Sequence, residues 1–173
     1  MNDSNSIPVI SDSDIPSGSG GINSERYTYG QLRRQPIISE ILNRITDPVV
    51  KRWAAECNRR NRSGFVMRKV CGEYCFDALH VGPKVKLPSK TDLVKKFGRM
   101  PSASEIREVS YSLLREEIAR QTGMSVAKAA SAIGNMLDCV PHEDISGFVY
   151  MVPNWAHKWF RHKGYVSLIL GNE

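Results

Sequence analysis

The stretch Glu117–Ile133 reads EIARQTGMSVAKAASAI and decides the fold that we expect. Its small and apolar side chains recur at helical spacing on both sides of Gly123. Glycine adopts the positive φ that a sharp turn between two helices requires, and Ser125 is a favoured residue at the start of a helix. Ala119 is small enough for the first helix to pack closely on the second, and Met124 would cover the turn. The stretch therefore predicts two helices joined by a tight turn at Gly123.

This pattern, taken over residues 115–137, resembles the helix-turn-helix superfamily of DNA-binding proteins. The resemblance implies that the second helix is presented to the major groove of duplex DNA, where Asn135 could read adenine and Lys128 guanine. The alternative is a helical hairpin that belongs to the core and reads no bases, because the second helix has one lysine and many alanines. The exposed positions of the second helix would be Val126, Ala127, Lys128, Ser131 and Asn135.

The sequence before this unit predicts further helices. Ser104 is expected to cap a long amphipathic helix that leads to Gly123. Asp47-Pro48 predicts the start of a helix that ends near Arg59, because Asp caps helices and Pro suits their first position. Apolar residues recur at helical spacing in 32–45 and in 65–79, which predicts two more helices. Residues 82–103 are rich in Pro and Lys and predict a connector, in which 93–97 could form a short helix.

The C-terminal part has a different pattern. Phe148–Val152 and Tyr165–Leu170 are typical of strands, and residues 153–163 between them predict a short helix or a loop. Two such strands suit the wing of a winged-helix variant. The fold class that we expect is therefore mainly α, a helical domain with a helix-turn-helix-like unit and a small C-terminal two-stranded β element.

The length of 173 residues fits one domain with a tail. Residues 1–26 are acidic and rich in Ser and Gly, and they predict a disordered tail, since such a segment buries too little apolar surface to offset its ordering entropy. Residues 27–173 are expected to form a single helical domain. Its parts are a basic helical part at 27–81, the connector at 82–103 and the helix-turn-helix-like part with the C-terminal strands at 104–173.

A short apolar segment within the tail, Ile7-Pro8-Val9-Ile10, is followed by the acidic run Ser11–Asp14. Residues 7–14 thus resemble a SUMO-interacting motif. The resemblance implies a protein partner whose sheet gains a strand at its edge and whose basic surface meets the acids. The alternative is an apolar island that arose by chance.

The composition indicates in which cellular compartment we expect the protein. No run approaches the roughly 18 apolar residues of a transmembrane helix, and the N-terminus lacks the basic and apolar regions of a secretory signal. Four cysteines are too few for a disulfide scaffold, so we expect reduced thiols. These features predict an intracellular protein, cytoplasmic or nuclear, without membrane contact.

The positive charge is concentrated in the middle of the chain. The formal net charge is +6, and residues 31–100 carry 16 Lys and Arg against six acids, whereas both flanking segments are slightly acidic. Because Lys and Arg bind phosphate oxygens, this block predicts a polyanionic partner, with solvated surface charge as the alternative. The expected contacts are Lys51, Arg52, Arg59, Arg60, Arg62, Arg68 and Lys69 in a first cluster and Lys84, Lys86, Lys95, Lys96 and Arg99 in a second.

Basic side chains alternate with large aromatic ones over residues 155–163. Such a segment could place cations and stacking faces beside a nucleic-acid backbone. Alternatively, the aromatic residues are core anchors and the cations are solvated. The cations are His157, Lys158, Arg161, His162 and Lys163, and the aromatic residues are Trp155, Trp159 and Phe160.

Two groups of residues are candidates for a metal site. The first group has ligand types that Zn²⁺ prefers, but its spacing differs from that of common zinc fingers, so we expect small buried thiols instead. The second, His142 with Glu143 and Asp144, is the local cluster that could serve a metal-dependent nuclease. The sequence has no phosphate-binding glycine loop and no nucleophile elbow, so we expect neither an enzyme nor a cofactor. The first group consists of Cys57, Cys71, Cys75 and His80.

Together these features predict a nucleic-acid-binding protein, a regulatory or architectural factor that contacts DNA rather than RNA through its central Arg and Lys clusters. The alternative is an interaction or assembly protein whose basic block binds RNA or an acidic protein partner. A homodimer is compatible with either function.

Overall fold

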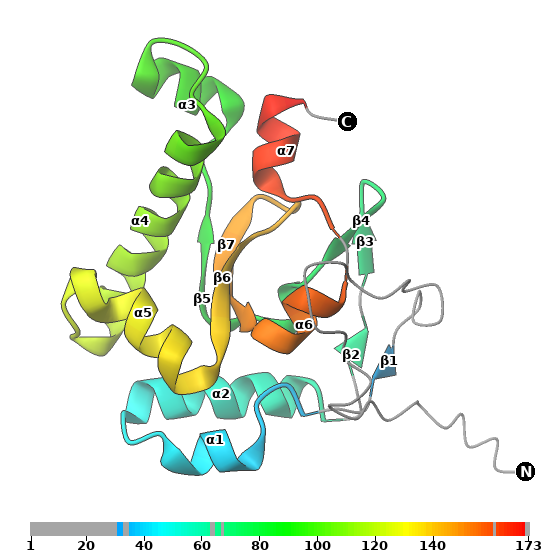
Figure 1. The fold of residues 1–173 in the computed structure, drawn as a ribbon, viewed down its shortest axis with the longest axis vertical. Coiled ribbons are helices and arrows are strands. Elements are labelled where there is room, and N and C mark those ends of the chain that lie inside the picture. Colours follow the sequence, from blue (N-terminus) through cyan, green and yellow to red (C-terminus); the bar gives the residue numbers. More distant parts are fainter. Residues whose placement is uncertain (1–30, 33–34, 63–64, 67, 161, 172–173) are drawn as a thin grey trace, which may run out of the picture.

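The computed structural model describes residues 31–32, 35–62, 65–66, 68–160 and 162–171 (Figure 1). These residues form seven α-helices and three small antiparallel sheets, so the mainly α class is confirmed. The predicted tail at 1–26 and the apolar motif at 7–14 lie outside the described residues. None of the helices in the described part of the chain is long and apolar enough to span a bilayer.

The central sheet has three strands in the order β5 (Val81–Lys86), β7 (Phe148–Pro153) and β6 (Cys139–Glu143), all antiparallel. β6 and β7 form a hairpin in which His142 pairs with Tyr150. Gly147, with φ +86°, closes the hairpin by donating its N–H to the Asp144 carbonyl at 2.9 Å. β6 is an edge strand of this sheet, so one side of it is open to the helices and loops around it.

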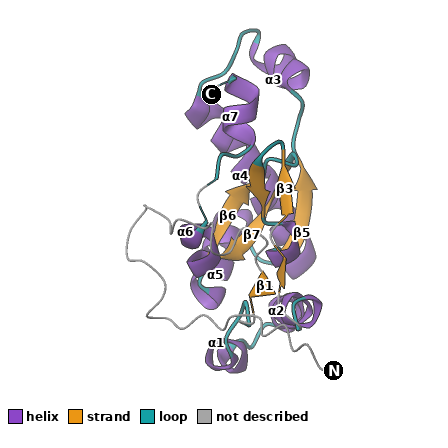
Figure 2. Ribbon diagram, turned by 90° about the vertical axis from the view of Figure 1, so that its right-hand side faces the viewer, coloured by secondary structure: helices purple, strands orange, loops and turns teal. Residues whose placement is uncertain are grey.

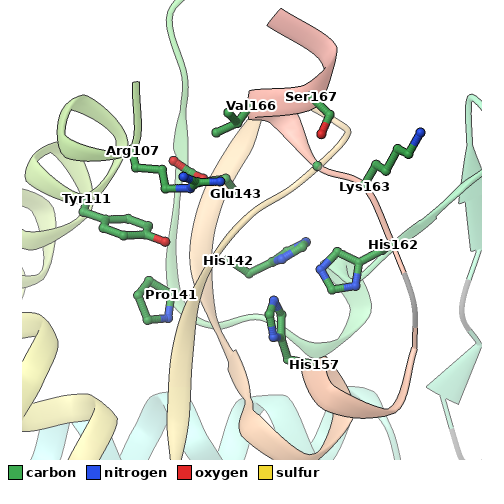
Figure 3. Close-up of a pocket in the computed structure, with 11 residues that line it drawn as sticks. Arg107, Tyr111, Pro141, His142, Glu143, His157, His162, Lys163, Val166 and Ser167 are labelled. Atoms are coloured by element: carbon green, nitrogen blue, oxygen red, sulfur yellow. The ribbon is translucent and has the colours of Figure 1, made fainter. Parts of the chain in front are cut away.

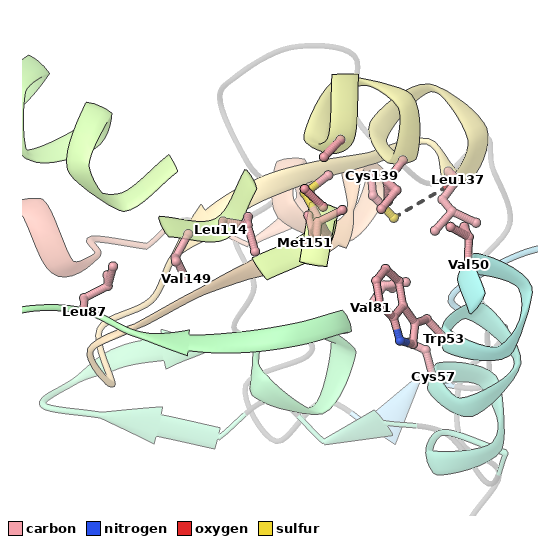
Figure 4. Packing of buried hydrophobic residues seen from close by; sticks show 14 of the residues in the cluster. Val50, Trp53, Cys57, Val81, Leu87, Leu114, Leu137, Cys139, Val149 and Met151 are labelled. Atoms are coloured by element: carbon pink, nitrogen blue, oxygen red, sulfur yellow. Dashed lines mark hydrogen bonds between the residues drawn. The ribbon is translucent and has the colours of Figure 1, made fainter. Parts of the chain in front are cut away.

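The sheet separates two hydrophobic clusters, because successive side chains of a strand point to opposite faces. Val149 and Met151 of β7 pack into the larger cluster with residues from the helices on one face, as Figure 4 shows. Tyr150 and Val152 belong to the smaller cluster on the other face, together with Phe160 and others. This alternation confirms the predicted strand at 148–152.

The helices surround the sheet (Figure 1). Figures 1 and 2 show α7 beside α3 at one end of the molecule, and α1 with α2 at the other end. The Tyr165 hydroxyl ties α7 to this end by donating to the Pro88 carbonyl. The helices are α1 (Ser39–Arg44), α2 (Pro48–Arg60), α3 (Lys90–Phe97), α4 (Ala103–Thr122), α5 (Val126–Leu137), α6 (Asn154–Trp159) and α7 (Tyr165–Leu170).

The hairpin of α4 and α5 confirms the turn predicted at Gly123, which has φ +77° and ends α4 in the left-handed conformation. α5 buries Ala129 and Ile133 against the core. The N-cap of α4 is Ser102, two residues before the predicted Ser104, and it forms a capping box with Glu105. The start of α2 is also as predicted, since the Asp47 carboxylate accepts hydrogen bonds from Val49 and Val50 at 3.0 Å.

The helix predicted over residues 65–79 is wrong. This segment forms the strands β2 (Phe65–Val66), β3 (Arg68–Val70) and β4 (Glu73–Cys75), with β2 paired to β1 (Gln31–Leu32), and a 3₁₀ turn at Asp77–Leu79. Cys71 and Gly72 have φ +51° and +79°, which makes them a two-residue hairpin turn between β3 and β4. A helix cannot continue through two consecutive residues in the left-handed region.

The connector predicted at 82–103 contains the strand β5 besides the predicted short helix. β5 has a bulge between Val81 and Val85, and Gly82 within it has φ +80°. A Cβ at Gly82 would lie 2.9 Å from the Trp53 ring, so the position also requires glycine for space. A local sequence pattern does not reveal β5, because its partner β7 lies far along the chain.

The strand predicted at 165–170 is wrong, because these residues form α7. Tyr165, Val166 and Ile169 are buried, which is one helical face, and Gly171 ends the helix with φ +66°. A run of six residues that is almost entirely apolar fits a strand and a buried helix equally well. The two-stranded C-terminal element is therefore absent from the described residues, and β7 pairs instead with β5 and β6.

Candidate metal centre

Three imidazole rings converge at the open edge of the sheet, and Figure 3 shows their nitrogens turned toward one another. His142 comes from β6, His157 from α6, and His162 from the segment before α7. One nitrogen from each ring lies within 4.8 Å of the other two. The ring centroids are 5.2 Å apart for His142 and His157, 4.9 Å for His142 and His162, and 4.7 Å for His157 and His162.

The local fold brings these three residues together. α6 follows β7 directly, and the Asn154 N–H donates to the Asp138 carbonyl at 2.9 Å, which holds the start of α6 against the start of β6. Ala156 and Phe160 are buried in the smaller cluster, and His157 lies on the neighbouring face of α6, beside His142 and Phe76. The chain then returns past β6 at Gly164, whose backbone lies directly against the Glu143 carbonyl.

His142 is oriented by a buried carboxylate. Its Nε2 lies 2.8 Å from Oδ1 of Asp144, and the exposed fractions of the two side chains are 3% and 0%. An N–H at Nε2 that donates to the carboxylate leaves Nδ1 as the lone-pair nitrogen of the ring. Metal-binding histidines are commonly held in this way by a carboxylate that does not contact the metal.

Asp144 is fixed as a charged acceptor. Besides His142, it accepts hydrogen bonds from the Phe76 N–H at 3.1 Å, from the Cys75 thiol at 3.0 Å and from Ser146. Burial alone would raise the pKa of Asp144, but the hydrogen bonds from His142, Ser146 and Cys75 outweigh burial and lower the pKa. The carboxylate is therefore ionised and its position is defined by four residues.

The other two rings are also prepared to act as ligands. Nδ1 of His162 lies 2.7 Å from the Phe160 carbonyl, so that nitrogen carries the proton and Nε2 has the lone pair. Burial, and then the proximity of His162 and His142, lower the pKa of His157 to about 3. Burial is also the main cause that lowers the pKa of His162. Both rings are thus neutral near pH 7, and neutral imidazole is the form that binds metals.

The ring centroids are spaced as around a tetrahedral ion, whereas the nitrogens, within 4.8 Å of one another, would draw together to the roughly 3.3 Å that such an ion imposes. With Zn–N bonds of about 2.0–2.1 Å, three imidazoles on a tetrahedral ion have ring centroids about 5 Å apart. The three centroid distances given above lie within a few tenths of an ångström of that value. Phe76 is fully buried and packs edge-on against His142 and His162, each at 4.8 Å between centroids, which provides a rigid apolar support behind the rings.

The three rings line a pocket of about 300 Å³. α4 contributes Arg107 and Tyr111 to the wall of this pocket, and Glu143 projects from the face of β6 opposite to His142 (Figure 3). Oε1 of Glu143 is shielded from solvent and has no hydrogen-bond partner among the described residues. Burial, its largest influence, raises the pKa of Glu143. The remaining lining residues are Pro141, Lys163, Gly164, Val166 and Ser167.

The cysteines of the predicted zinc group do not gather around a metal position. Cys57 is buried and directs its thiol to the Leu79 carbonyl at 3.6 Å, whereas Cys71 is exposed. Cys75 donates to Asp144, and Nδ1 of His80 lies 2.6 Å from the Asp77 carbonyl. Within the described part of the chain, the histidine cluster is the metal-type group. The expectation of buried thiols is confirmed for Cys57 and Cys75 and is wrong for Cys71; Cys139, outside that group, is also buried.

Of the local cluster His142, Glu143 and Asp144, the structure retains His142 as a candidate ligand and gives Asp144 a different role, as the partner that orients it. His157 and His162 were interpreted from sequence as cations beside a nucleic acid, whereas burial makes them neutral. The signal that could have indicated the cluster is that three of the four histidines of the chain lie between residues 142 and 162.

The residues predicted to contact nucleic acid are spread over several elements. Lys163 lies in the pocket, and Arg59 and Arg62 line a separate groove beside α2. Arg161 and the side chain of Arg68 lie outside what the structure describes. The other predicted contacts are exposed: Lys51, Arg52, Arg60 and Lys69, then Lys84, Lys86, Lys95, Lys96 and Arg99, and finally Lys128, Ser131, Asn135 and Lys158.

Comparisons with known proteins add no relative: no family model, no curated protein and no solved structure matches this chain.

Proposed function

We propose that the protein binds a divalent ion of the Zn²⁺ type through His142, His157 and His162, and that this ion serves a chemical reaction. The observation that carries the proposal is the convergence of three imidazoles with centroids 4.7–5.2 Å apart. Nδ1 of His142 and Nε2 of His162 are the ligand atoms that their hydrogen bonds to Asp144 and Phe160 leave available. A Zn²⁺ ion is the best match, since it favours neutral imidazole ligands in tetrahedral geometry.

A chemical role fits this site better than a structural one. Structural zinc sites use four protein ligands, whereas catalytic sites use three and leave the fourth position to water or substrate. All three rings line the pocket, which gives a fourth ligand access from solvent. When bound, such an ion acts as a Lewis acid and makes a coordinated water a nucleophile near neutral pH. The class of reaction that fits is hydrolysis, in which the oxygen of one water bonds to the electrophilic atom, the bond to the leaving group breaks, and a proton of that water passes to the leaving group.

Isothermal titration of the purified chain with Zn²⁺ tests this function, and the visible absorption of bound Co²⁺ reports the coordination geometry. We expect about one ion per chain in a four-coordinate site. His157→Gln and His162→Gln should each lower the affinity at least about 100-fold, since removing a ligand costs more than removing its supporting partner. His80→Gln is the matched control, because His80 binds the Asp77 carbonyl and lies outside the cluster. Equal Zn²⁺ affinity in all four proteins would overturn the proposal.

We also propose a second function, nucleic-acid binding, which the exposure of the central basic residues favours. α2 and the turn after it expose five cations, and the groove beside α2 combines Arg59 and Arg62 with the polar side chains of Asn58 and Asn61. The helix-turn-helix-like hairpin of α4 and α5 would dock on DNA without a C-terminal wing, through the exposed face of α5 that contains Lys128, Ser131 and Asn135. The five cations are Lys51, Arg52, Arg59, Arg60 and Arg62.

A titration of duplex DNA at increasing salt tests the second function. Neutralising about six phosphates predicts a slope near −5 in a plot of log affinity against log salt. Replacing Lys128, Ser131 and Asn135 together should remove sequence preference while the fold, followed by circular dichroism, is retained. A slope near zero on DNA would exclude DNA binding. Tight binding to single-stranded RNA or to an acidic protein instead would favour the alternative, an interaction or assembly protein.

A further inference from the structure

The pocket beside the histidine cluster has an excess of positive charge. Its lining includes two cations, Arg107 and Lys163, against one acid, Glu143. A divalent ion on the histidines would add two further positive charges. We infer that the pocket binds a phosphate ester, with Arg107 and Lys163 contacting the phosphate oxygens that the metal ion does not. This inference rests on the proposed metal site and names the substrate class for it.

Arg107 is placed to contact a ligand in the pocket. It projects from α4 toward the space between α4 and β6 (Figure 3). No carboxylate among the described residues comes within ion-pair distance of its guanidinium, although Glu143 lines the same wall. The neighbouring Arg115 of α4, in contrast, pairs with Glu108 at 2.8 Å. Arg107 therefore has donors available for a planar, two-point contact with phosphate oxygens.

Lys163 lies at the rim of the pocket, next to His162. Its backbone N–H donates to Oε2 of Glu73 at 2.9 Å, which fixes the chain at this point while the exposed ammonium extends into solvent. A lysine ammonium acts as a mobile point charge that can follow a phosphate into a site. Figure 3 shows Arg107 beside Glu143 on the α4 side of the pocket and Lys163 at the opposite rim, so a phosphate held between them would require the flexible lysine stem to turn inward.

Glu143 offers the acceptor that such a ligand requires. Its Oε1 is shielded from solvent and accepts no hydrogen bond from the described residues. A hydrogen-bond acceptor that is shielded from water and has no partner destabilises the folded protein. A ligand that donates a hydrogen bond to Oε1 would therefore gain binding free energy. A phosphate ester brings such donors, either a hydroxyl of its ester group or the water that attacks the phosphorus.

The size and chemistry of the pocket favour phosphate over carboxylate. Its volume of about 300 Å³ lies at the lower end of the range for ligand pockets and accommodates a phosphate with part of its ester group. A phosphate has enough oxygens to bind the metal and both cations together, whereas a carboxylate has two. A phosphodiester of nucleic acid and a small phosphomonoester share this chemistry, and the test below distinguishes them.

The test uses the full chain loaded with Zn²⁺ and titrates inorganic phosphate by calorimetry, with acetate as the carboxylate probe. Phosphate should bind and acetate should bind much more weakly. Arg107→Gln and Lys163→Gln should each weaken phosphate binding about tenfold or more while Zn²⁺ affinity stays unchanged. Arg120→Gln, on the same helix but in an ion pair with Glu117, is the matched control and should bind phosphate like the unmodified chain.

Competition against bound phosphate then shows whether the natural ligand is a phosphodiester of nucleic acid or a small phosphomonoester. A dinucleoside phosphate that competes better than a nucleoside monophosphate assigns a nucleic-acid phosphodiester, and the reverse order assigns a phosphomonoester. The substrate class would be overturned if both the Arg107 and the Lys163 variant bound phosphate as tightly as the unmodified chain does, or if acetate bound as tightly as phosphate. If Zn²⁺ itself does not bind, the proposed function fails, and that result is visible before any phosphate is added.

Discussion

Asp144 and His142 form a buried hydrogen bond of 2.8 Å at the start of the β6–β7 turn, and the same carboxylate joins this turn to the segment after β4. The Phe76 N–H and the Cys75 thiol reach Asp144 from residues that are 68 and 69 positions away in the sequence. The residue that orients a candidate ligand is thus also a tertiary link. Changing it should affect both metal binding and stability.

Asp144→Asn should weaken metal binding and also destabilise the fold, and each loss can be measured by itself. An amide has one acceptor oxygen, so the donors of His142, Ser146, Phe76 and Cys75 cannot all be satisfied. We expect a 10–100-fold loss of Zn²⁺ affinity, which is typical when the hydrogen-bond partner of a metal-binding histidine is removed. We also expect the unfolding free energy to fall by roughly 3 kcal/mol. Titration calorimetry and urea denaturation measure the two.

Ser146→Ala is the control for this change, because it removes one donor to Asp144 and leaves the carboxylate in place. It should cost only about 1 kcal/mol of stability and leave the metal affinity within a few-fold. An Asp144→Asn protein with unchanged Zn²⁺ affinity would show that the carboxylate does not orient His142 as a ligand.

Gly164 should be intolerant of any side chain. A Cβ at this position would overlap the Glu143 carbonyl, and the backbone on both sides of the contact carries residues of the site, His162 and His142. Gly164→Ala should therefore weaken Zn²⁺ binding as well as lower the melting temperature. Gly98→Ala is the contrasting variant: Gly98 has φ +70° but open space around it, so it should cost about 1 kcal/mol of stability without changing metal affinity. Similar Zn²⁺ affinity in both variants would contradict this.

The sequence predicts those parts of the fold that depend on neighbouring residues. Gly123 marks the turn between α4 and α5, Asp47-Pro48 marks the start of α2, and the apolar run at 148–152 marks β7. Each of these signals acts within one turn of helix or one strand. Short apolar runs without such a signal are ambiguous, which is why α7 was expected as a strand.

The candidate site could be predicted only in part, because its residues meet through tertiary contacts. His142 stood out beside two acids in the sequence, but the two further histidines reach it because α6 folds back over β6. The sequence suggests that His157 and His162 are surface cations. In the structure, burial lowers their pKa values and makes both rings neutral. No spacing rule along the chain contains that information, since it depends on which face of the sheet α6 covers.

Thiol reactivity provides a test of the burial of the cysteines. Burial raises the pKa of Cys57 to about 11 and, together with the Asp144 contact, that of Cys75 to about 12, and it raises that of Cys139 well above its ordinary value. Because the thiolate is the reactive form, iodoacetamide at pH 8 should modify the exposed Cys71 in the native protein and the other three only in denaturant. Mass spectrometry of digested protein gives the sites. Rapid native labelling of Cys57 or Cys139 would contradict the packing described for them.

The ion pair between Arg99 and Glu105 predicts how stability depends on pH at the start of α4. The Arg99 guanidinium contacts both carboxylate oxygens, at 2.7 and 3.0 Å, and this contact with the bond from the Ser102 N–H lowers the pKa of Glu105 to about 2. A carboxyl whose pKa is lower in the folded than in the unfolded protein stabilises the fold above its unfolded pKa. That contribution is lost as the pH falls from about 5 to about 2.

Glu105→Gln should therefore lower the melting temperature at pH 7, and the difference from the unmodified chain should shrink as the pH approaches 2. Arg99 is exposed and Glu105 is partly exposed, so added salt should also reduce the difference at pH 7. Glu116→Gln is the control on the same helix, because Glu116 is exposed and forms no ion pair with another described residue, and it should leave the melting temperature at pH 7 nearly unchanged. Thermal melts at a series of pH values measure both variants. A difference for Glu105→Gln that is the same at pH 7 and pH 2 would mean that the ion pair does not stabilise α4.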